Sequence, residues 1–278
     1  MLVWLIFTSK ACCGLFSSTT QTPPPIHQPA SDGHHDVSLT KSMHASARSF
    51  RAGGFTLIEL LIVISIIVIL MGLLFPAFKG VQDQAKRIQA KNDLTQIVTA
   101  VNAFYTEYGK YPVNVASGNT TDAFFGTGTI PTGDTSYGDN DVLIDVLRNN
   151  TSSTNNSATV TLLNPRQIVF ISPPYVKSST QPRAGIASQT VTVNGISIPI
   201  GTFVDPWGMP YNAEIDTNYN NSVPNPYGAL SVGGAGADPV SQGVIAWSLG
   251  KDTKLGNNGD NIYKTSTGVQ SDDVISWQ

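Results

Sequence analysis

A long helix is the first element that the pattern of apolar positions predicts. Nineteen consecutive residues, 60–78, carry no charge, and such a run can span the bilayer core as a helix of roughly 30 Å. Good helix formers continue through residues 79–108. The helix should end at residues 109–112, because glycine followed closely by proline terminates helices. A continuous helix over residues 55–108 would extend on the order of 80 Å.

The apolar stripe of this helix changes side partway along. Two sets of apolar residues recur at spacings of three and four: a lower stripe of Phe78, Val81, Ala85 and Ile88, and an upper stripe of Leu94, Ile97, Val98, Val101, Phe104, Tyr105 and Tyr108. At about 100° per residue, the upper stripe falls roughly opposite the lower one. Between them lies a polar neck at residues 89–93. We expect the lower stripe to pack against other copies and the upper stripe against the chain's own head, unless sparse polar substitutions only mimic a change of side.

Beyond the helix, the pattern predicts an α+β head with a small antiparallel sheet. Residues 117–136 and 149–157 are rich in Gly, Thr, Asn and Ser and are predicted as loops. Residues 141–148 should form a short helix. Residues 189–200 alternate around Asn194-Gly195, a dipeptide that favours a tight hairpin turn. Further strands are predicted at residues 167–171, 211–215 and 244–249.

The residues in front of the apolar segment resemble a processing site. A secretory signal places small residues after its apolar stretch, whereas Gly53 and Gly54 precede it here, so the apolar segment stays on the mature chain. Arg48 and Arg51 lie just before it, as in a cytoplasmic leader. The pattern G-F-T-L-I-E closely resembles the site of type IV pilins and type II secretion pseudopilins. The resemblance implies that a prepilin peptidase cuts after Gly54 and methylates the amine of Phe55.

The leader that this cut implies, residues 1–54, is long for the family. Residues 43–54 alone form a basic leader of ordinary length that starts with Met43. The preceding run TPPPIHQPASDGHH has the composition of a disordered segment. We favour a translation start at Met43, and a genuine long leader is the alternative.

Removing the leader changes the chemistry that the chain can perform. Both cysteines and all four histidines lie upstream of the cut, and the remainder has 12 Lys+Arg against 17 Asp+Glu. Cysteine nucleophiles, Ser-His relays, disulfides and zinc sites with the usual ligands are therefore excluded. A net charge of −5 argues against nucleic acid as a partner. We expect a structural protein and not an enzyme.

Two residues of the apolar helix are candidates for roles in assembly. Glu59 lies at its start, where an uncompensated charge in lipid costs several kcal/mol. We expect it to pair with the amino terminus of a neighbouring subunit. Pro76 should weaken or kink the helix at a cost of about 3 kcal/mol. In related filaments the helix near this position is locally extended after assembly, and a simple proline kink is the alternative here.

Two further motifs resemble segments of the major (G-type) pseudopilins. Residues 205–211 read DPWGMPY, similar to the D-P-W-G-x-P-Y segment of that family. Two prolines and a glycine predict a rigid turn, and Trp207 supplies an apolar anchor. We interpret this segment as scaffold. Near the C-terminus, SLGKD at 248–252 and DDVISW at 272–277 resemble the two halves of the family's calcium loop.

The second resemblance implies a structural Ca²⁺ site. Its ligands would be the carboxylates of Asp252, Asp272 and Asp273 and the backbone carbonyl of Leu249. Oxygen-rich, glycine-rich segments of this kind can surround a hard cation. Asn257 and Asp260 are less certain ligands, because the intervening loop is longer than in the family. An acidic loop without metal is the alternative. Residues 216–220 also resemble a calcium loop, but without the glycine and distal glutamate of an EF-hand we interpret them as a turn.

Together, the resemblances imply a major pseudopilin of a type II secretion system. It would be a single-pass protein of the bacterial inner membrane with its head in the periplasm, polymerising into a filament of identical subunits. Its partners would be the prepilin peptidase, minor pseudopilins, the inner-membrane secretion platform and, before assembly, membrane lipid. The mature chain would comprise an assembly helix (55–78), an amphipathic continuation (79–110) and a head (111–278). A loop-rich insertion at 113–200 leaves open a minor pilin or type IV pilus subunit that acts as a binding or adhesion module.

Overall fold

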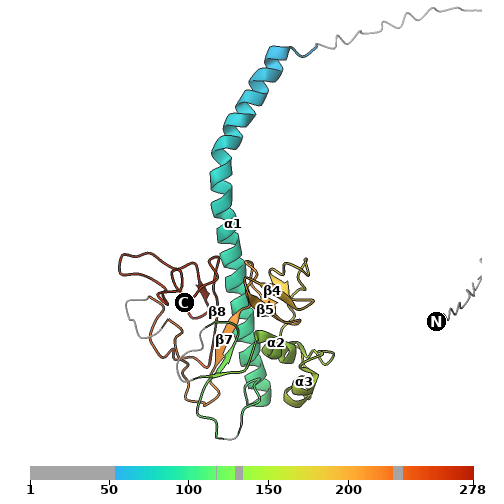
Figure 1. Cartoon of the computed structure of the whole chain (residues 1–278), viewed down its shortest axis with the longest axis vertical. Helices are drawn as coiled ribbons and strands as arrows, with labels where there is room; N and C mark the ends of the chain where they lie inside the picture. Colours follow the sequence, from blue (N-terminus) through green and yellow to red (C-terminus); the bar gives the residue numbers. More distant parts are fainter. Residues whose placement is uncertain (1–53, 117, 129–133, 228–233) are drawn as a thin grey trace, which may run out of the picture. The chain divides into compact units, whose positions relative to one another are not determined.

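The computed structural model describes residues 54–278 except 117, 129–133 and 228–233. The leader predicted from the sequence lies outside the described residues, apart from Gly54. The described chain forms one long helix, α1 (Leu57–Tyr108), and a head of short strands and two small helices. The second half of α1 runs through this head (Figure 1). The α+β class predicted from the sequence is confirmed.

Both ends of α1 are defined by local hydrogen bonds. Thr56 is the N-cap and forms a capping box with Glu59. At the other end, Gly109 adopts a left-handed conformation with φ of 67°, and its N–H donates to the Tyr105 carbonyl at 2.8 Å. A left-handed glycine is the common way to end a helix. The helix thus ends where the glycine–proline pattern predicts.

The two halves of α1 have different surroundings. Leu57–Phe75 has a mean hydropathy of 3.1, is long enough to cross a membrane and is not buried against the head. The lower stripe is also exposed, with Val81 at 64%. In contrast, Leu94, Val101 and Phe104 of the upper stripe are fully buried in the head. The predicted packing of the upper stripe is confirmed, whereas the partner of the lower stripe stays a prediction.

The polar neck joins the helix to the C-terminal part of the head. The Lys91 ammonium donates to the carbonyls of Ile275 at 2.7 Å and Gln278. Asp93 accepts a hydrogen bond of 2.8 Å from the Tyr211 hydroxyl. Two charged side chains of the helix thus form hydrogen bonds with two separate segments of the head. These bonds fix how α1 lies against the sheet.

A five-stranded sheet forms the centre of the head, in the order β2-β1-β7-β8-β9. Its strands are β1 (Ala123–Phe125), β2 (Thr135–Ser136), β7 (Asn212–Ile215), β8 (Val244–Ser248) and β9 (Val274–Ile275). All neighbouring strands are antiparallel except β1 and β2, which are parallel. The helix α1 packs against β8 and β9.

The segment between β2 and β7 carries smaller elements. These are α2 (Asn140–Arg148), α3 (Ser157–Leu163), β3 (Gly185–Ile186), β4 (Val191–Val193), β5 (Ile196–Ile198) and β6 (Phe203–Val204). β4 and β5 form the hairpin predicted around Asn194-Gly195, and both turn residues have positive φ, 51° and 81°. Positive φ at both central positions is the geometry of a type I′ turn.

The two faces of the central sheet bury separate apolar clusters. On the face toward α1, Ala123, Ala213 and Ala246 join the buried side chains of α1 and α2 in the main core. On the other face, Phe124 and Trp247 pack with Tyr227 and the C-terminal Trp277. This alternation follows from the two-residue period of a strand.

Two predicted elements are wrong. Residues 117–136, predicted as a loop, contain β1 and β2. β1 has three residues that are buried on both faces, so its sequence lacks the alternation that reveals a strand. Residues 167–171, predicted as a strand, are irregular. The side chain of Asn164 bonds both backbone groups of Ile168, and the N–H of Phe170 donates to the Leu147 carbonyl. These bonds replace a strand ladder.

Candidate functional site

Three carboxylates converge at the C-terminal end of the head. One oxygen from each of Asp252, Asp272 and Asp273 lies within 4.8 Å of the others. Asp252 follows β8, and the other two precede β9. Antiparallel pairing places Ser248 opposite Val274, and therefore brings two segments that are distant in the sequence to the same end of the sheet. We refer to these three residues as the C-terminal carboxylate cluster.

Gly250 allows the two segments to approach closely. Its φ is +66°, and a Cβ atom there would clash with the carbonyl oxygen of Asp272. Backbone therefore meets backbone at this point, and a side chain cannot be accommodated without movement of the Asp272 segment. The close approach of the two backbone segments thus explains why the S-L-G motif has glycine at position 250.

The cluster is only partly satisfied by hydrogen bonds. Asp273 is buried, and its Oδ2 accepts from the Tyr227 hydroxyl at 2.9 Å and from the Gly256 N–H at 2.7 Å. Its Oδ1 is buried and has no hydrogen-bond partner among the described residues. Asp272 Oδ2 accepts from the Asp252 N–H at 2.9 Å. A buried carboxylate oxygen without a partner is costly, and an opposite charge beside it would offset that cost.

Burial also perturbs the titration of Asp273. Burial raises the pKa of Asp273 to about 7, hydrogen bonds from Gly256, Tyr227 and Ser271 lower it, and the charge of Asp272 raises it further. A nearby cation would favour the ionised carboxylate and offset the repulsion within the cluster.

The chemistry of the cluster fits Ca²⁺, which takes oxygen ligands in a flexible shell. Leu249 is buried and directly follows β8, three residues before Asp252. Asp260 is exposed and lies outside the cluster, and its Oδ1 accepts from the N–H groups of Asn257 at 2.7 Å and Ile262 at 2.9 Å. The structure thus brings three predicted carboxylates together and places the two less certain residues in an adjacent turn. Calcium binding itself stays a prediction.

The turn at residues 205–211 is hydrogen-bonded to the segment that carries Asp252, and the sequence patterns did not predict this contact. Asp205 is fully buried. Its Oδ1 accepts from three successive N–H groups, those of Trp207, Gly208 and Met209, and its Oδ2 accepts from the Ser248 hydroxyl at 2.6 Å. An aspartate before proline and glycine signals such a turn, but the sequence does not reveal the bond to Ser248. The two motifs therefore form one hydrogen-bonded unit.

Residues 216–220 form a turn, as predicted. Asp216 accepts from the N–H groups of Asn220 at 3.1 Å and Asn221 at 2.7 Å. The loop backbone therefore satisfies this carboxylate.

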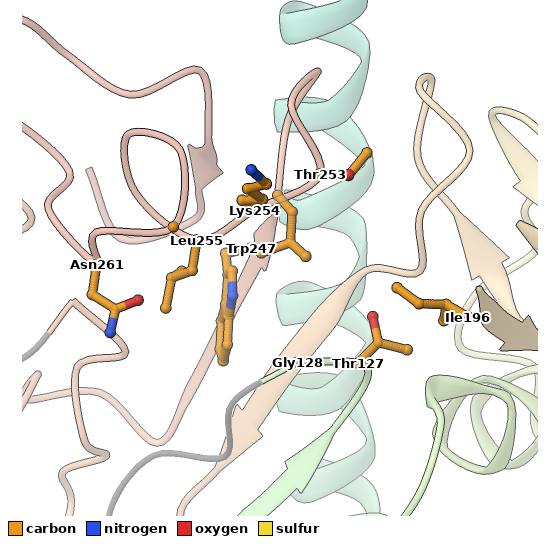
Figure 2. Close-up of a pocket in the computed structure, with 10 residues that line it drawn as sticks. Thr127, Gly128, Ile196, Trp247, Thr253, Lys254, Leu255 and Asn261 are labelled. Carbon is orange, nitrogen blue, oxygen red and sulfur yellow. The ribbon is translucent and has the colours of Figure 1, made fainter. Parts of the chain in front are cut away.

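A cavity of about 230 Å³ lies beside the C-terminal loop. It is lined by Thr127, Gly128, Ile196, Trp247, Leu249, Thr253, Lys254, Leu255, Gly259 and Asn261. Figure 2 shows that Trp247 and the loop residues Lys254 and Leu255 line one part of it, with Ile196 and Thr127 across from them. Because Leu249 and Thr253 line the cavity and Asp252 of the cluster lies between them in the sequence, the conformation of this loop shapes both.

At the other end of the chain, the processing residues lie ahead of α1. Gly54 has no atom within 4 Å of the position that a Cβ would occupy, and Phe55 is 79% exposed. The part of the fold that the structure describes therefore imposes no requirement for glycine at position 54. Glu59 Oε2 accepts from the Thr56 N–H at 2.9 Å. α1 continues through position 76 without interruption.

Comparison with known proteins agrees with the N-terminal features. The family model of the prokaryotic N-terminal methylation motif matches residues 49–75. The type IV major pilin protein PilA of Myxococcus xanthus (strain DK1622) is 41% identical over 69 residues, which are 25% of this chain and 31% of PilA. The chain thus matches about a third of the length of this curated relative. No solved structure matches.

The methylation motif and the apolar helix that follows it are thus similar to the N-terminal part of a type IV pilin, and the α+β head is consistent with the type IV pilin and pseudopilin family. Members of this family are generally structural subunits. Neither comparison distinguishes a secretion subunit from a subunit of a surface pilus.

Processing can be tested at Gly54. We expect Gly54→Leu to block cleavage, because the peptidase site, and not the fold, requires glycine there. Mass spectrometry of membrane fractions should show a wild-type chain that begins with methylated Phe55 and an uncut variant. Gly72→Leu is the matched control, since Gly72 also has open space around it, and this variant should be processed. A wild-type mature chain that begins at any other residue contradicts the prediction.

The close approach at Gly250 can be tested against a second left-handed glycine. Gly268 has φ of +87°, but no atom lies within 4 Å of the position that a Cβ would occupy, so Gly268→Ala should cost only the conformational term of about 1–2 kcal/mol. Gly250→Ala adds a clash with the Asp272 carbonyl and should cost about 3 kcal/mol or more. Denaturant unfolding of the two variants measures the difference. Equal losses would contradict the close approach.

Proposed function

We propose that this chain is a structural subunit of a type II secretion pseudopilus, polymerised through its N-terminal helix into a periplasmic filament that supports protein export. The observation that carries the proposal is the contact between the two pseudopilin-like motifs. Asp205 of one accepts a hydrogen bond from Ser248 of the other, four residues before Asp252. Motifs far apart in the sequence that meet in one unit support a shared structural role.

Assembly through α1 follows from its exposed half. The apolar surface of Leu57–Phe75 has no cover within the head, and each buried Å² of such surface is worth about 25 cal/mol. Lipid covers it in the single-pass inner-membrane form before assembly, and neighbouring copies cover it in the filament. Prepilin peptidase, minor pseudopilins and the inner-membrane secretion platform would act on this form.

Glu59 sets the register of assembly in this proposal. In the single chain its carboxylate caps the first turn of α1 through Thr56. In the filament it would instead pair with the Phe55 amine of a neighbouring subunit, because a charge among apolar helices requires an opposite charge. The carboxylate thus has one partner before assembly and another after it.

A structural Ca²⁺ at the C-terminal carboxylate cluster is also proposed. Asp252, Asp272 and Asp273, with the Leu249 carbonyl, would hold it. The unpartnered Asp273 Oδ1 supports this. The same aspartate is bonded to Tyr227, whose ring lies 6.2 Å from that of Trp277. A bound cation would therefore keep the C-terminal segment against the second apolar cluster.

A type IV pilus subunit or minor pilin that acts as a binding module is the second candidate. The identity with a type IV major pilin favours it, as does the large segment that carries α2, α3 and the β4–β5 hairpin. Deletion of the gene distinguishes the secretion subunit from the pilus subunit or minor pilin. We expect export of secreted proteins to fail while surface pili persist, and loss of pili with normal export would overturn the secretion assignment.

The role of Glu59 can be tested by neutralisation. Glu59→Leu should still insert in the membrane but fail to form filaments, because the register-setting pair is lost. Electron microscopy and cross-linking of membrane fractions measure assembly. Glu107→Leu removes a glutamate from the same helix, where it pairs with Arg166 in the head, and should still assemble. Normal filaments from Glu59→Leu would show that the charge is dispensable.

Calcium binding can be tested by local proteolysis of the full chain in detergent. Millimolar Ca²⁺ should protect Lys254 and Lys264 from trypsin, since a bound cation closes this loop and binding to the native state stabilises it. Mg²⁺ should protect poorly. Asp273→Asn should abolish the protection. Asp260→Asn, which removes the same charge from the adjacent turn, should retain it. Equal cleavage of the wild type in calcium and in chelator would show that the cluster is an acidic surface that binds no calcium.

A further inference from the structure

A second group of carboxylates lies toward the opposite edge of the sheet from β9, where β1, β2 and β7 meet. The register pairs Phe124 with Glu214, and Ala123 with Thr135. Asp122 directly precedes Ala123, and Asp134 directly precedes Thr135. Because side chains alternate along strands, Asp122, Asp134 and Glu214 all project from one face, the face on which Phe124 lies. The sheet register thus places Glu214 of β7 on the same face as two acidic residues that directly precede β1 and β2.

Two of these carboxylates, Asp122 and Glu214, are buried, Asp134 is half-buried, and no positively charged side chain of the described residues pairs with any of them. Glu214 is 0% exposed and Asp122 is 4% exposed. Among the described residues, four of their six carboxylate oxygens are buried without a hydrogen-bond partner: Asp122 Oδ1, Asp134 Oδ2 and both oxygens of Glu214. The ion pairs found within the described ranges involve none of the three. Buried carboxylates normally have hydrogen bonds, an opposite charge or a metal.

The three groups also interact with one another. Burial, followed by the charges of Asp134 and Asp122, raises the pKa of Glu214 to about 10. Burial and the charge of Asp134 raise the pKa of Asp122 to about 6, although the N–H groups of Thr217 and Asn218 lower it. Like charges that interact in a water-poor site do not all ionise unless a positive group joins them.

We propose that Asp122, Asp134 and Glu214 bind a divalent cation, with Ca²⁺ the best match, at a site separate from the C-terminal carboxylate cluster. The donors are all carboxylate oxygens, the ligands that hard cations prefer. Side chains from three separate segments suit the irregular shell of Ca²⁺ better than the strict octahedron of Mg²⁺. Glu214 would be the central ligand, because it is fully buried and neither of its carboxylate oxygens has a hydrogen-bond partner among the described residues.

Such a cation would have a structural task. β2 is a two-residue edge strand, paired only with β1 by the described register. A cation held by Asp134 and Glu214 would tie this edge to β7, two strands away, and so fix the start of the segment that leads into α2. This site is independent of the proposed role in secretion.

Calcium stoichiometry tests the proposal. The full chain in detergent is stripped with chelator and dialysed against millimolar Ca²⁺, and bound calcium per chain is measured by atomic emission. We expect Asp273→Asn, which removes the C-terminal site, to retain one calcium per chain, and the double variant Asp273→Asn/Glu214→Gln to retain none. Glu107→Gln, in the exposed pair with Arg166, is the matched control for Glu214→Gln and should not change the count.

Two results would overturn the proposal. One is an Asp273→Asn chain that is folded by circular dichroism and binds no calcium. The other is a Glu214→Gln chain that binds as much as the wild type, which would mean that a proton, not a cation, neutralises the site. If Glu214→Gln does not fold, Asp134→Asn at the less buried edge carries the same test. A loss of one calcium with Glu214→Gln but none with Asp273→Asn would support this site and refute the C-terminal one.

Discussion

The apolar half of α1 is not covered by any other described part of the chain, and the rest of the molecule depends on how that surface is removed from water. Leu57 is 88% exposed, and the whole segment to Phe75 lacks contacts with the head. A lipid bilayer and a bundle of identical helices can both cover it. In lipid the carboxylate of Glu59 is costly, whereas among copies it can meet a positive amine. The proposed transfer from membrane to filament follows from this difference.

The head holds the second half of α1 in a fixed position. The buried upper stripe, the bonds from Lys91 to the C-terminal carbonyls and the bond between Asp93 and Tyr211 fix α1 to the sheet. Both edge strands, β2 and β9, have only two residues. Short edges limit unwanted pairing between heads, but they are weakly held. Asp134 precedes β2 and Asp273 precedes β9, and both have a buried carboxylate oxygen without a partner among the described residues. A cation at each edge would therefore stabilise these two short strands.

Strongly periodic features of this chain could be predicted from the sequence. The long helix, its end at Gly109 and the burial of the upper stripe follow from spacing and from glycine chemistry. The hairpin at Asn194-Gly195 follows from its turn residues. In contrast, β1 is a three-residue strand inside a Gly- and Thr-rich stretch, and only its tertiary pairing makes it a strand. Propensity cannot detect such an element.

The sites were predictable to different degrees. The C-terminal aspartates were found through resemblance, and the strand pairing of β8 with β9 explains why they meet. The bond between Asp205 and Ser248 joins residues 43 positions apart, and the Asp122, Asp134 and Glu214 group depends on the register of three strands. Neither could be predicted, because single-sequence patterns carry no information on register between distant strands.

The most direct measurement is a structure of the assembled filament by electron cryomicroscopy. We predict a helical polymer whose interior consists of residues 57–75 of successive copies, with the lower stripe in contact with neighbouring subunits and the heads outside. Each Glu59 carboxylate should lie within ion-pair distance of the Phe55 amine of a neighbour. A filament joined through the heads, with the apolar helices still facing lipid or solvent, would contradict the central claim.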